Sequence, residues 1–254
     1  MTRTYGWRRP ARHVGLKVPH AAIAMLLRGM PDRGDLASVL PPIWDQGQLG
    51  SCTGHAVARA LFALQRWQGR TPFEASRLAL YYGGREMIGE TDQDGGASVG
   101  DVLVQARVQG FAPEGLWPYA PEAFAVRPSP AYRSEAQRHH LLDSLPLAHD
   151  LDSILWHLAS GRPVVVGVDV MPSFEAPETA RTGDVPMPRS GEDSIGGHAI
   201  ALTGWDTPAG EFTFDNSWGP SWGRVGRGRI PYDYILDAAL CGEIHAPLSV
   251  RDVR

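Results

Sequence analysis

Cysteine is scarce in this chain: its 254 residues include two, Cys52 and Cys241. Two cysteines cannot form a disulfide framework and also leave one of them free, so the fold does not require an oxidising compartment. No secretory signal peptide is recognisable, because Pro19 and His20 interrupt the approach to the short apolar run 21–27. Localisation therefore stays open between the cytoplasm and export without a classical signal.

An excess of charge and a long apolar run are missing as well. The 24 basic and 28 acidic residues give a formal net charge of −4, and basic residues gather only in the short run 3–12. This balance does not favour a nucleic-acid partner. No run approaches the roughly 20 apolar residues that cross a bilayer, so no membrane partner is expected. His139 and His140 are either solvent-exposed or a weak metal site, and because no further ligands at metal-binding spacing join them, the sequence predicts no metal and no cofactor.

Glycine and proline, in contrast, are abundant at 29 and 21 residues, which favours loops and short strands over a helical bundle. Helical periodicity and capping signals come first along the chain, and strand patterns follow. Helices are predicted at 53–68, 76–87, 98–110 and 151–158, and strands at 163–170, 198–205, 211–215 and, more weakly, 229–231 and 243–249. This separation of helices from strands predicts an α+β fold with two subdomains.

Three segments follow from this pattern. Residues 1–40 mix Arg, Pro and Gly and are expected to form an extended arm on the body of the protein, with two helical turns within 21–28. Residues 41–145 are predicted to form a mainly helical subdomain. A proline-rich, irregular connection at 111–149 leads into a mainly β subdomain, 146–254. The arm is either a structural strap or a segment that covers and gates an active site.

Cys52 lies where a tight loop runs into the first of these helices. Unpaired backbone N–H groups and the positive end of the helix dipole favour the thiolate at such a place, so we expect the pKa of Cys52 to be lowered. Gln46, which carries a side-chain amide donor, is six residues upstream. A reactive sulfur beside an amide donor indicates acyl-transfer chemistry. The other cysteine, Cys241, stands in an apolar context and is interpreted as a small buried hydrophobe.

His198 is the candidate base among nine histidines. It follows two glycines and opens an apolar strand, and the next strand ends immediately before Asn216. If the two strands pair as a hairpin, the Asn216 carbonyl oxygen can accept a hydrogen bond from one imidazole nitrogen and leave the other for the thiol. Trp218 can shield that hydrogen bond from water. His55, about one turn after Cys52 on the same helix, is a poor in-line base and is interpreted as structural or cleft-lining.

These residues resemble the motifs of the papain-like cysteine peptidases. The match includes the glutamine-to-cysteine spacing of 46–52, a Gly-His-Ala at 197–199 and the string N-S-W-G-P-S-W-G at 216–223. A weaker match, Asp-Gly-Gly at 94–96, is similar to the glycine pair that contacts bound peptide in that family. The histidine lies 146 residues beyond the cysteine (198 − 52), within the family's spacing. The resemblance covers about residues 40–245.

The resemblance implies a helical left subdomain and a β-barrel-like right subdomain, with the active-site cleft between them. It also assigns roles to individual residues. These are the catalytic Cys52, His198 and Asn216, the oxyanion-hole donors Gln46 and Cys52, the substrate-binding Gly95, Gly96 and Gly197, and the supporting Trp218.

The implied activity is hydrolysis of peptide bonds in a peptide or protein substrate through a thioester acyl-enzyme, with the arm as a candidate autoinhibitor. Leu49 and Thr53 replace a cysteine and a tryptophan that are common in the family, and this departure resembles its prokaryotic branch. Two alternatives stay open. One is a catalytically silent binding module of the same fold, and the other is an acyl transferase that passes the acyl group to an amine.

Overall fold

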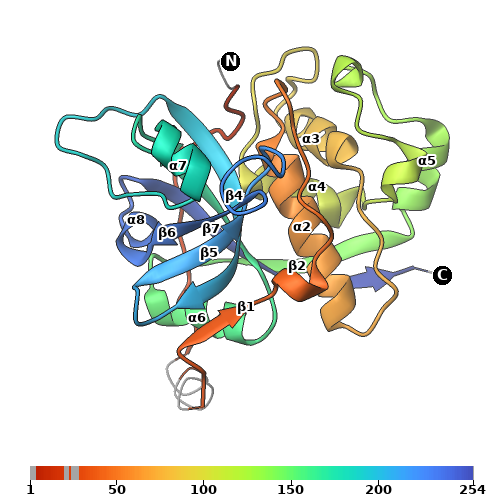
Figure 1. Cartoon of the computed structure of the whole chain (residues 1–254). Coiled ribbons are helices and arrows are strands. Elements are labelled where there is room, and N and C mark those ends of the chain that lie inside the picture. The colour runs from red at the N-terminus through yellow and green to blue at the C-terminus, as the bar shows by residue number, and fades with distance from the viewer. Residues whose placement is uncertain (1–3, 20–22, 24–28, 254) are drawn as a thin grey trace.

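The three helices predicted before residue 110 gather on one side of the molecule and the predicted strands on the other, while the helix predicted at 151–158 lies with the strands (Figure 1). This is seen in the computed structural model, which describes residues 4–19, 23 and 29–253. No helix within these residues is both long and apolar enough to cross a membrane. The arrangement confirms the expected α+β class.

The helical side is built from α2 (Cys52–Trp67), α3 (Arg77–Glu86) and α4 (Val99–Val108), and each matches a predicted helix. Two of them begin at a serine cap. The hydroxyl of Ser76 accepts a hydrogen bond from a backbone N–H in the first turn of α3, and Ser98 does the same for α4. Such caps satisfy backbone donors that have no partner within the helix, which fixes where each helix starts.

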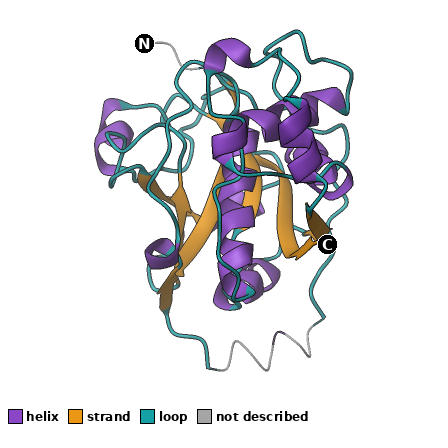
Figure 2. Ribbon diagram, turned by 90° about the vertical axis from the view of Figure 1, so that its right-hand side faces the viewer, coloured by secondary structure: helices purple, strands orange, loops and turns teal. Residues whose placement is uncertain are grey.

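The long helix α2 lies between the sheet and the other helices of this half (Figures 1 and 2). Its small side chains Ala56, Ala60 and Ala63 are buried and let neighbouring elements approach closely. This confirms the buried central helix that its apolar faces predict. Because α2 packs against strand β4 (Gly196–Asp206), its first turn faces the β half of the molecule.

The β half is a seven-stranded antiparallel sheet in the order β2-β7-β3-β4-β5-β6, with β1 paired to β4. Its other strands are β1 (Arg33–Asp35), β2 (His139–Pro146), β3 (Val164–Val170), β5 (Glu211–Asp215), β6 (Arg227–Pro231) and β7 (Cys241–Asp252). The last five strands, β3 to β7, confirm the predicted ones. In the described part of the chain β2 and β6 stand at opposite ends of the path, so the half expected to be barrel-like is here an open sheet.

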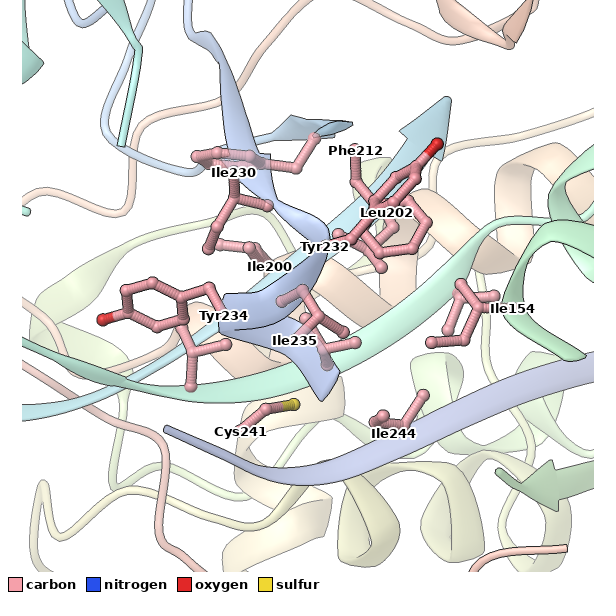
Figure 3. Packing of buried hydrophobic residues seen from close by; sticks show 14 of the residues in the cluster. Ile154, Ile200, Leu202, Phe212, Ile230, Tyr232, Tyr234, Ile235, Cys241 and Ile244 are labelled. Atoms are coloured by element: carbon pink, nitrogen blue, oxygen red, sulfur yellow. The ribbon is translucent and has the colours of Figure 1, made fainter. Parts of the chain in front are cut away.

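A large apolar core fills the β half and is covered by α6 (Leu151–Ala159) and α8 (Tyr232–Leu236) (Figure 3). The predicted cap Asp150 begins α6 by accepting a hydrogen bond from the backbone N–H of Ser153. Cys241 is fully buried in this core, as predicted. A short helix, α7 (Pro177–Thr182), adds to this side of the fold.

The stretch expected to be irregular, 111–149, contains regular structure, so that expectation was wrong. It holds α5 (Pro130–Ala136), strand β2 and two short 3-10 helices, Glu114–Leu116 and Pro121–Ala123. Prolines begin two of these helices, where the missing N–H costs nothing. Register shifts at Leu141, Asp143 and Ser144 interrupt the alternation of side chains between the two faces of β2. The sequence of this strand therefore lacks the period of two by which a strand is recognised.

The histidine pair at the start of β2 is not simply exposed to solvent, as the sequence suggested. His140 is buried and its ring nitrogens contact the carbonyl oxygens of Arg107 and Gln137. His139 lies between the carboxylates of Glu135 and Asp252. Both histidines therefore tie the edge strand to its surroundings.

Part of the arm joins the sheet. Strand β1 pairs with β4, and a 3-10 turn at Ala37–Val39 follows it. The two helical turns expected within 21–28 lie outside the described residues, apart from Ile23. Residues 4–19 run without regular elements along the body, where Trp7 and Leu16 form isolated parallel bridges with Ala97 and Leu147.

A buried ion pair fastens the two halves directly behind the candidate site. Arg59 on α2 donates through Nε to Asp215 Oδ2 at 3.0 Å, and Arg227 Nε lies 3.0 Å from Asp215 Oδ1. Arg59 Nη1 also donates to the carbonyl oxygens of Pro41 and Pro42, both at 2.8 Å. Removing one partner of such a desolvated pair typically costs about 3–5 kcal/mol. The pair therefore holds the end of β5, where Asn216 follows, against α2.

Candidate active site

Cys52 is the first residue of α2 and is fully buried. The loop before it carries Gln46, whose side chain is also buried. The sulfur lies beside the backbone of Ala199, the residue that follows His198 on β4. The docking of α2 on β4 thus brings the thiol of the helical half to the histidine strand.

His198 and Asn216 come together because β4 and β5 form the predicted hairpin. Ala201 pairs with Asp215 across it, so Asn216 follows at the level of Ile200, two residues from His198 and on the same face of β4. His198 Nε2 and Asn216 Oδ1 are 2.8 Å apart. Asn216 Oδ1 also accepts the backbone N–H of Ser217 at 2.8 Å, which fixes its orientation.

Trp218 stacks on the imidazole of His198, with ring centroids 4.5 Å apart and planes inclined by 26°. His198 and Asn216 are both buried. A hydrogen bond in so dry a place is stronger than one in water. The indole therefore lies where the sequence predicted a shield for this contact.

Gln46 is held by both halves of the molecule. Its Nε2 donates to the carbonyl oxygen of Leu49 at 2.9 Å, and its Oε1 accepts from the hydroxyl of Ser217 at 2.6 Å. Its backbone N–H donates to the carbonyl oxygen of Ser217 at 2.8 Å. Sequence reasoning did not give Ser217 a role, although it follows Asn216 directly. The two bonds of Ser217 with Gln46 fix the orientation of this amide donor on the loop that precedes Cys52.

The first residues of the arm cross the site. Ala97 donates its N–H to the carbonyl oxygen of Gly6 at 2.9 Å and accepts from Arg8 N at 3.0 Å, and Trp7 N donates to the carbonyl oxygen of Gly197 at 3.0 Å. The pairing of Trp7 with Ala97 is parallel. A single short strand of the arm therefore bridges the helical half and the β half.

Gly6 lies directly on the loop before Cys52. A Cβ atom on Gly6 would stand 1.6 Å from the carbonyl oxygen of Gly50, so only glycine fits there. The carbonyl oxygen of the neighbouring Thr4 is 3.5 Å from Gln46 Nε2. The arm thus brings backbone into contact with the loop, the thiol and the amide donor at once.

Burial raises the pKa of the Cys52 thiol to about 11, although the sequence predicts a lowered value. Hydrogen bonds with the backbone of Ala199 and Gly6 act in the opposite direction but do not offset the burial. The expectation rested on the helix terminus alone. It did not include the arm, whose Gly6 contributes to the cover over the sulfur.

The three glycines expected to contact substrate differ in their surroundings. Gly197 accepts a hydrogen bond from the arm, and Gly96 faces it, since a Cβ there would stand 2.3 Å from the carbonyl oxygen of Gly6. The backbone partner on the helical half is Ala97, which follows the predicted pair Gly95 and Gly96. The sequence offers one weak signal for Ala97, namely that it is the apolar residue directly after a glycine pair.

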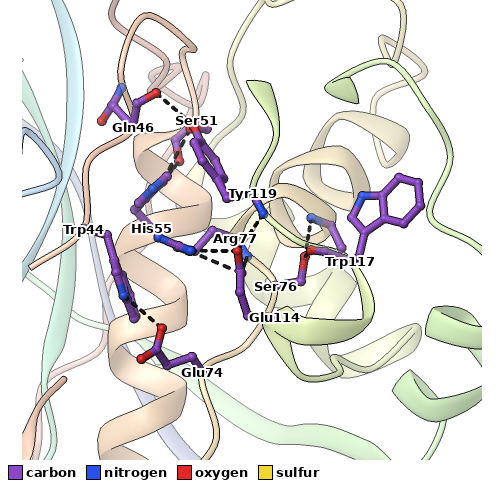
Figure 4. A network of polar contacts seen from close by, with 11 residues as sticks. Trp44, Gln46, Ser51, His55, Glu74, Ser76, Arg77, Glu114, Trp117 and Tyr119 are labelled. Carbon is purple, nitrogen blue, oxygen red and sulfur yellow. Dashed lines mark hydrogen bonds and ion pairs between the residues drawn. The ribbon is translucent and has the colours of Figure 1, made fainter. Parts of the chain in front are cut away.

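A polar network behind the loop supports Cys52 (Figure 4). The ring of His55 contacts the carbonyl oxygen of Ser51 through Nδ1 at 3.0 Å and packs edge-on against Tyr119 at 4.8 Å. Burial lowers the pKa of His55 to about 3, so its ring stays neutral. Tyr119 in turn donates to the carbonyl oxygen of Gln46 at 2.9 Å. His55 is therefore a structural residue, as interpreted from the sequence.

Solved structures with the same fold define the class of protein. The alignment with xylellain, a cysteine protease from Xylella fastidiosa, covers 98% of this chain and 96% of that one, with a TM-score of 0.85 and 28% identity. Procathepsin B S9 from Trypanosoma congolense matches at a TM-score of 0.74 and 15% identity over 98% of this chain and 87% of that one, which shows the fold. The fold is thus that of cysteine proteases.

Sequence comparison gives the family. An uncharacterised peptidase C1-like protein of Acanthamoeba polyphaga mimivirus is 34% identical over 217 residues, which are 82% of this chain and 70% of that protein. The model of the papain family cysteine proteases matches residues 30–242. The chain belongs to the papain family of cysteine proteases.

Proposed function

We propose that this protein hydrolyses peptide bonds through a thioester acyl-enzyme on Cys52, with His198 as acid and base and Asn216 as the residue that orients the imidazole. The observation that carries the proposal is the 2.8 Å contact of His198 Nε2 with Asn216 Oδ1 under the Trp218 ring, on the strand against which the first turn of α2 is packed. The N–H of His198 Nε2 donates a hydrogen bond to Asn216 Oδ1. Proton exchange with the thiol is therefore assigned to Nδ1.

In the proposed reaction His198 takes the thiol proton and the sulfur of Cys52 attacks the carbonyl carbon of the substrate. The imidazolium then gives its proton to the leaving amine as the C–N bond breaks, which leaves a thioester. A water molecule attacks the thioester while His198 accepts its proton, and the carboxylic acid leaves as the thiol is restored. Gln46 Nε2 and the Cys52 backbone N–H stabilise the oxyanion that forms in acylation and again in deacylation. Each such donor typically contributes about 10²–10³ in rate.

The same proposal makes the arm an internal inhibitor. The backbone of the arm forms hydrogen bonds with Ala97 and Gly197 on the two sides of the cleft, and it lies over the sulfur of Cys52. Several solved structures of the same fold are proforms of cysteine proteases, such as procathepsin L2 from Tenebrio molitor and a stem bromelain precursor. In this chain the inhibitor is the short arm of residues 1–40. Displacing it lets substrate reach Cys52.

A thiol-directed epoxide trap tests the proposal. We expect it to form one covalent adduct on Cys52, detected by mass spectrometry of the digested protein, and none on the buried Cys241. Cys52→Ala should remove the adduct, whereas the control Cys241→Ala should keep it. Products from a peptide ester with and without an added amine then separate hydrolysis from acyl transfer. Failure of the trap to modify Cys52 after the arm is displaced would contradict the proposal.

Docking of the arm should weaken in acid because of His13. Its ring packs 5.5 Å from that of His245 and 6.0 Å from that of His149, and its Nε2 contacts the carbonyl oxygen of Leu147 at 2.8 Å. Burial is the largest cause that lowers the pKa of His13 below 6.5; the hydrogen bond with the Leu147 carbonyl oxygen opposes it, His245 adds to the lowering, and Glu243 opposes it more weakly. The docked arm therefore binds fewer protons than the released arm.

A group with a depressed pKa stabilises docking above its normal value and loses that effect as the pH falls. We expect the rate of Cys52 trapping, relative to that of a Trp7→Ala variant at the same pH, to rise between pH 7.5 and pH 5.5. His13→Gln should make this ratio nearly independent of pH. A parent ratio that is flat over the interval would show that His13 does not control docking.

A further inference from the structure

The peptide group between Leu49 and Gly50 links the candidate oxyanion donor to a second loop. Its carbonyl oxygen accepts a hydrogen bond from Gln46 Nε2 at 2.9 Å. Its N–H donates to the carboxylate of Asp94, at 3.0 Å from Oδ2 and 3.2 Å from Oδ1. Because a peptide group is planar, the direction of its N–H also fixes the direction of its C=O. Asp94 therefore constrains the carbonyl oxygen to which the Gln46 amide is bonded.

Asp94 is in turn held by helix α3. The side chain of Tyr81 is fully buried, and its hydroxyl donates to Asp94 Oδ1 at 2.5 Å. Burial, and then the hydrogen bond with Asp94, raise the pKa of Tyr81, so the hydroxyl keeps its proton and remains a donor. The same hydroxyl oxygen accepts from the backbone N–H of Gly96 at 3.1 Å. Hydrogen bonds to an ionised acceptor are the strong ones, so the carboxylate has a fixed orientation.

A second side chain of α3 holds the rest of this loop independently of Asp94. Arg85 lies one turn after Tyr81 and is fully buried. Its Nη1 donates to the carbonyl oxygens of Thr91 at 2.9 Å and Gln93 at 2.7 Å. The loop that carries the glycine pair 95–96 is thus anchored on both sides of position 94. Loss of the Asp94 carboxylate would be felt first at Gly50.

The consequence of that loss is a rotation of the Leu49–Gly50 peptide group. Gly50 is buried, and a buried N–H without an acceptor is costly, so the group turns until the N–H finds another partner. The carbonyl oxygen of Leu49 turns with it, and Gln46 Nε2 loses the acceptor that orients it. Oxyanion donors act only when they are aimed at the position that the oxyanion will occupy.

We propose that Asp94 is a positioning residue for the reaction. It orients the Leu49–Gly50 peptide group, and through this group it orients the Gln46 amide of the oxyanion hole. This inference rests on the proposed peptidase function. Because the amide acts on the transition state, loss of Asp94 affects kcat more than KM.

Kinetics of the full chain, with the site opened by Trp7→Ala, test the inference. We expect Asp94→Ala to lower kcat for a fluorogenic peptide by at least about tenfold, up to the 10²–10³ that a lost oxyanion donor costs, while KM changes by less than about threefold. Asp94→Asn keeps an acceptor oxygen and should stay within about threefold of the parent kcat. The matched control Asp92→Ala removes an exposed carboxylate from the same loop and should leave both constants unchanged.

Two further measurements separate positioning from a general structural role. Methyl methanethiosulfonate converts Cys52 to a methyl disulfide with loss of methanesulfinate, and no carbonyl oxyanion forms. Its rate in Asp94→Ala should therefore stay within about twofold of the parent. The second measurement is a double variant. Gln46→Ala removes the amide through which Asp94 acts, so adding Asp94→Ala should lower kcat by less than about threefold further.

Tyr81→Phe protects the test against poor folding of Asp94→Ala. It fills nearly the same space and removes the donor that holds the carboxylate, so kcat should fall about threefold with the same unchanged rate of Cys52 modification. A kcat that both variants leave intact, a matching loss of Cys52 modification in both, or full additivity with Gln46→Ala overturns the inference alone. The absence of peptide hydrolysis in the open parent overturns the peptidase proposal, and this inference with it.

Discussion

Replacing Cys52 by alanine is expected to lower peptide hydrolysis to the uncatalysed background, at least about 10⁴-fold below the parent. The substitution removes the sulfur that forms the acyl-enzyme, and no other nucleophile takes its place, since Cys241 is buried in the core of the β half. His198→Ala should cause a loss of similar size, because the thiol then has no proton acceptor. Both variants are measured with the arm opened by Trp7→Ala, so that access to the site does not limit the rate.

The double variant provides the sharper measurement. Residues that act as one unit lose their effect together, so Cys52→Ala with His198→Ala should be no slower than either single variant. A measurement of the thermal unfolding of each variant shows whether the loss of activity is caused by unfolding. Cys241→Ala is the matched control and should retain activity. A Cys52→Ala variant that keeps a tenth of the parent activity would show that the thiol does not carry the reaction.

The elements around this site were accessible from the sequence because local signals determine them. Ser98 and Asp150 cap helices, and the hairpin of β4 and β5 follows from two strand patterns joined by a short turn. That hairpin places Asn216 beside His198, as predicted. The helix start that carries Cys52 was likewise readable from the chain.

The contacts that bury the thiol were not accessible in this way. Trp7 and Glu243 are 236 positions apart, and nothing local connects an indole in the arm with a carboxylate in the last strand. The raised pKa of Cys52 comes from the complete burial of its thiol, so the helix-terminus argument alone gave the wrong direction. Strand β2 was missed for a different reason, because its register shifts break the period that identifies a strand.

The segment of the arm that crosses the candidate site carries one large buried side chain, that of Trp7, while Gly6 and Arg8 contribute backbone bonds. Loss of a buried tryptophan side chain typically costs about 3–5 kcal/mol, which is a factor of 10² or more in a docking equilibrium. Trp7 is one member of the large core of the helical half, whereas the core of the β half is formed without it.

Trp7→Ala is therefore expected to raise the rate of peptide hydrolysis by at least about tenfold, up to the rate of the fully open enzyme. Because the sulfur is uncovered, trapping of Cys52 at neutral pH should accelerate as well. Trp67→Ala is the matched control: Trp67 ends α2 at the opposite end from Cys52, is 49% exposed and packs on Arg162, so the rate should not change. A synthetic peptide of residues 1–19 should inhibit the Trp7→Ala enzyme when added in trans, and the same peptide with Trp7→Ala should not. Equal rates for the parent and Trp7→Ala, with Cys52 trapped equally fast in both, would mean that the arm is a strap that leaves the site open.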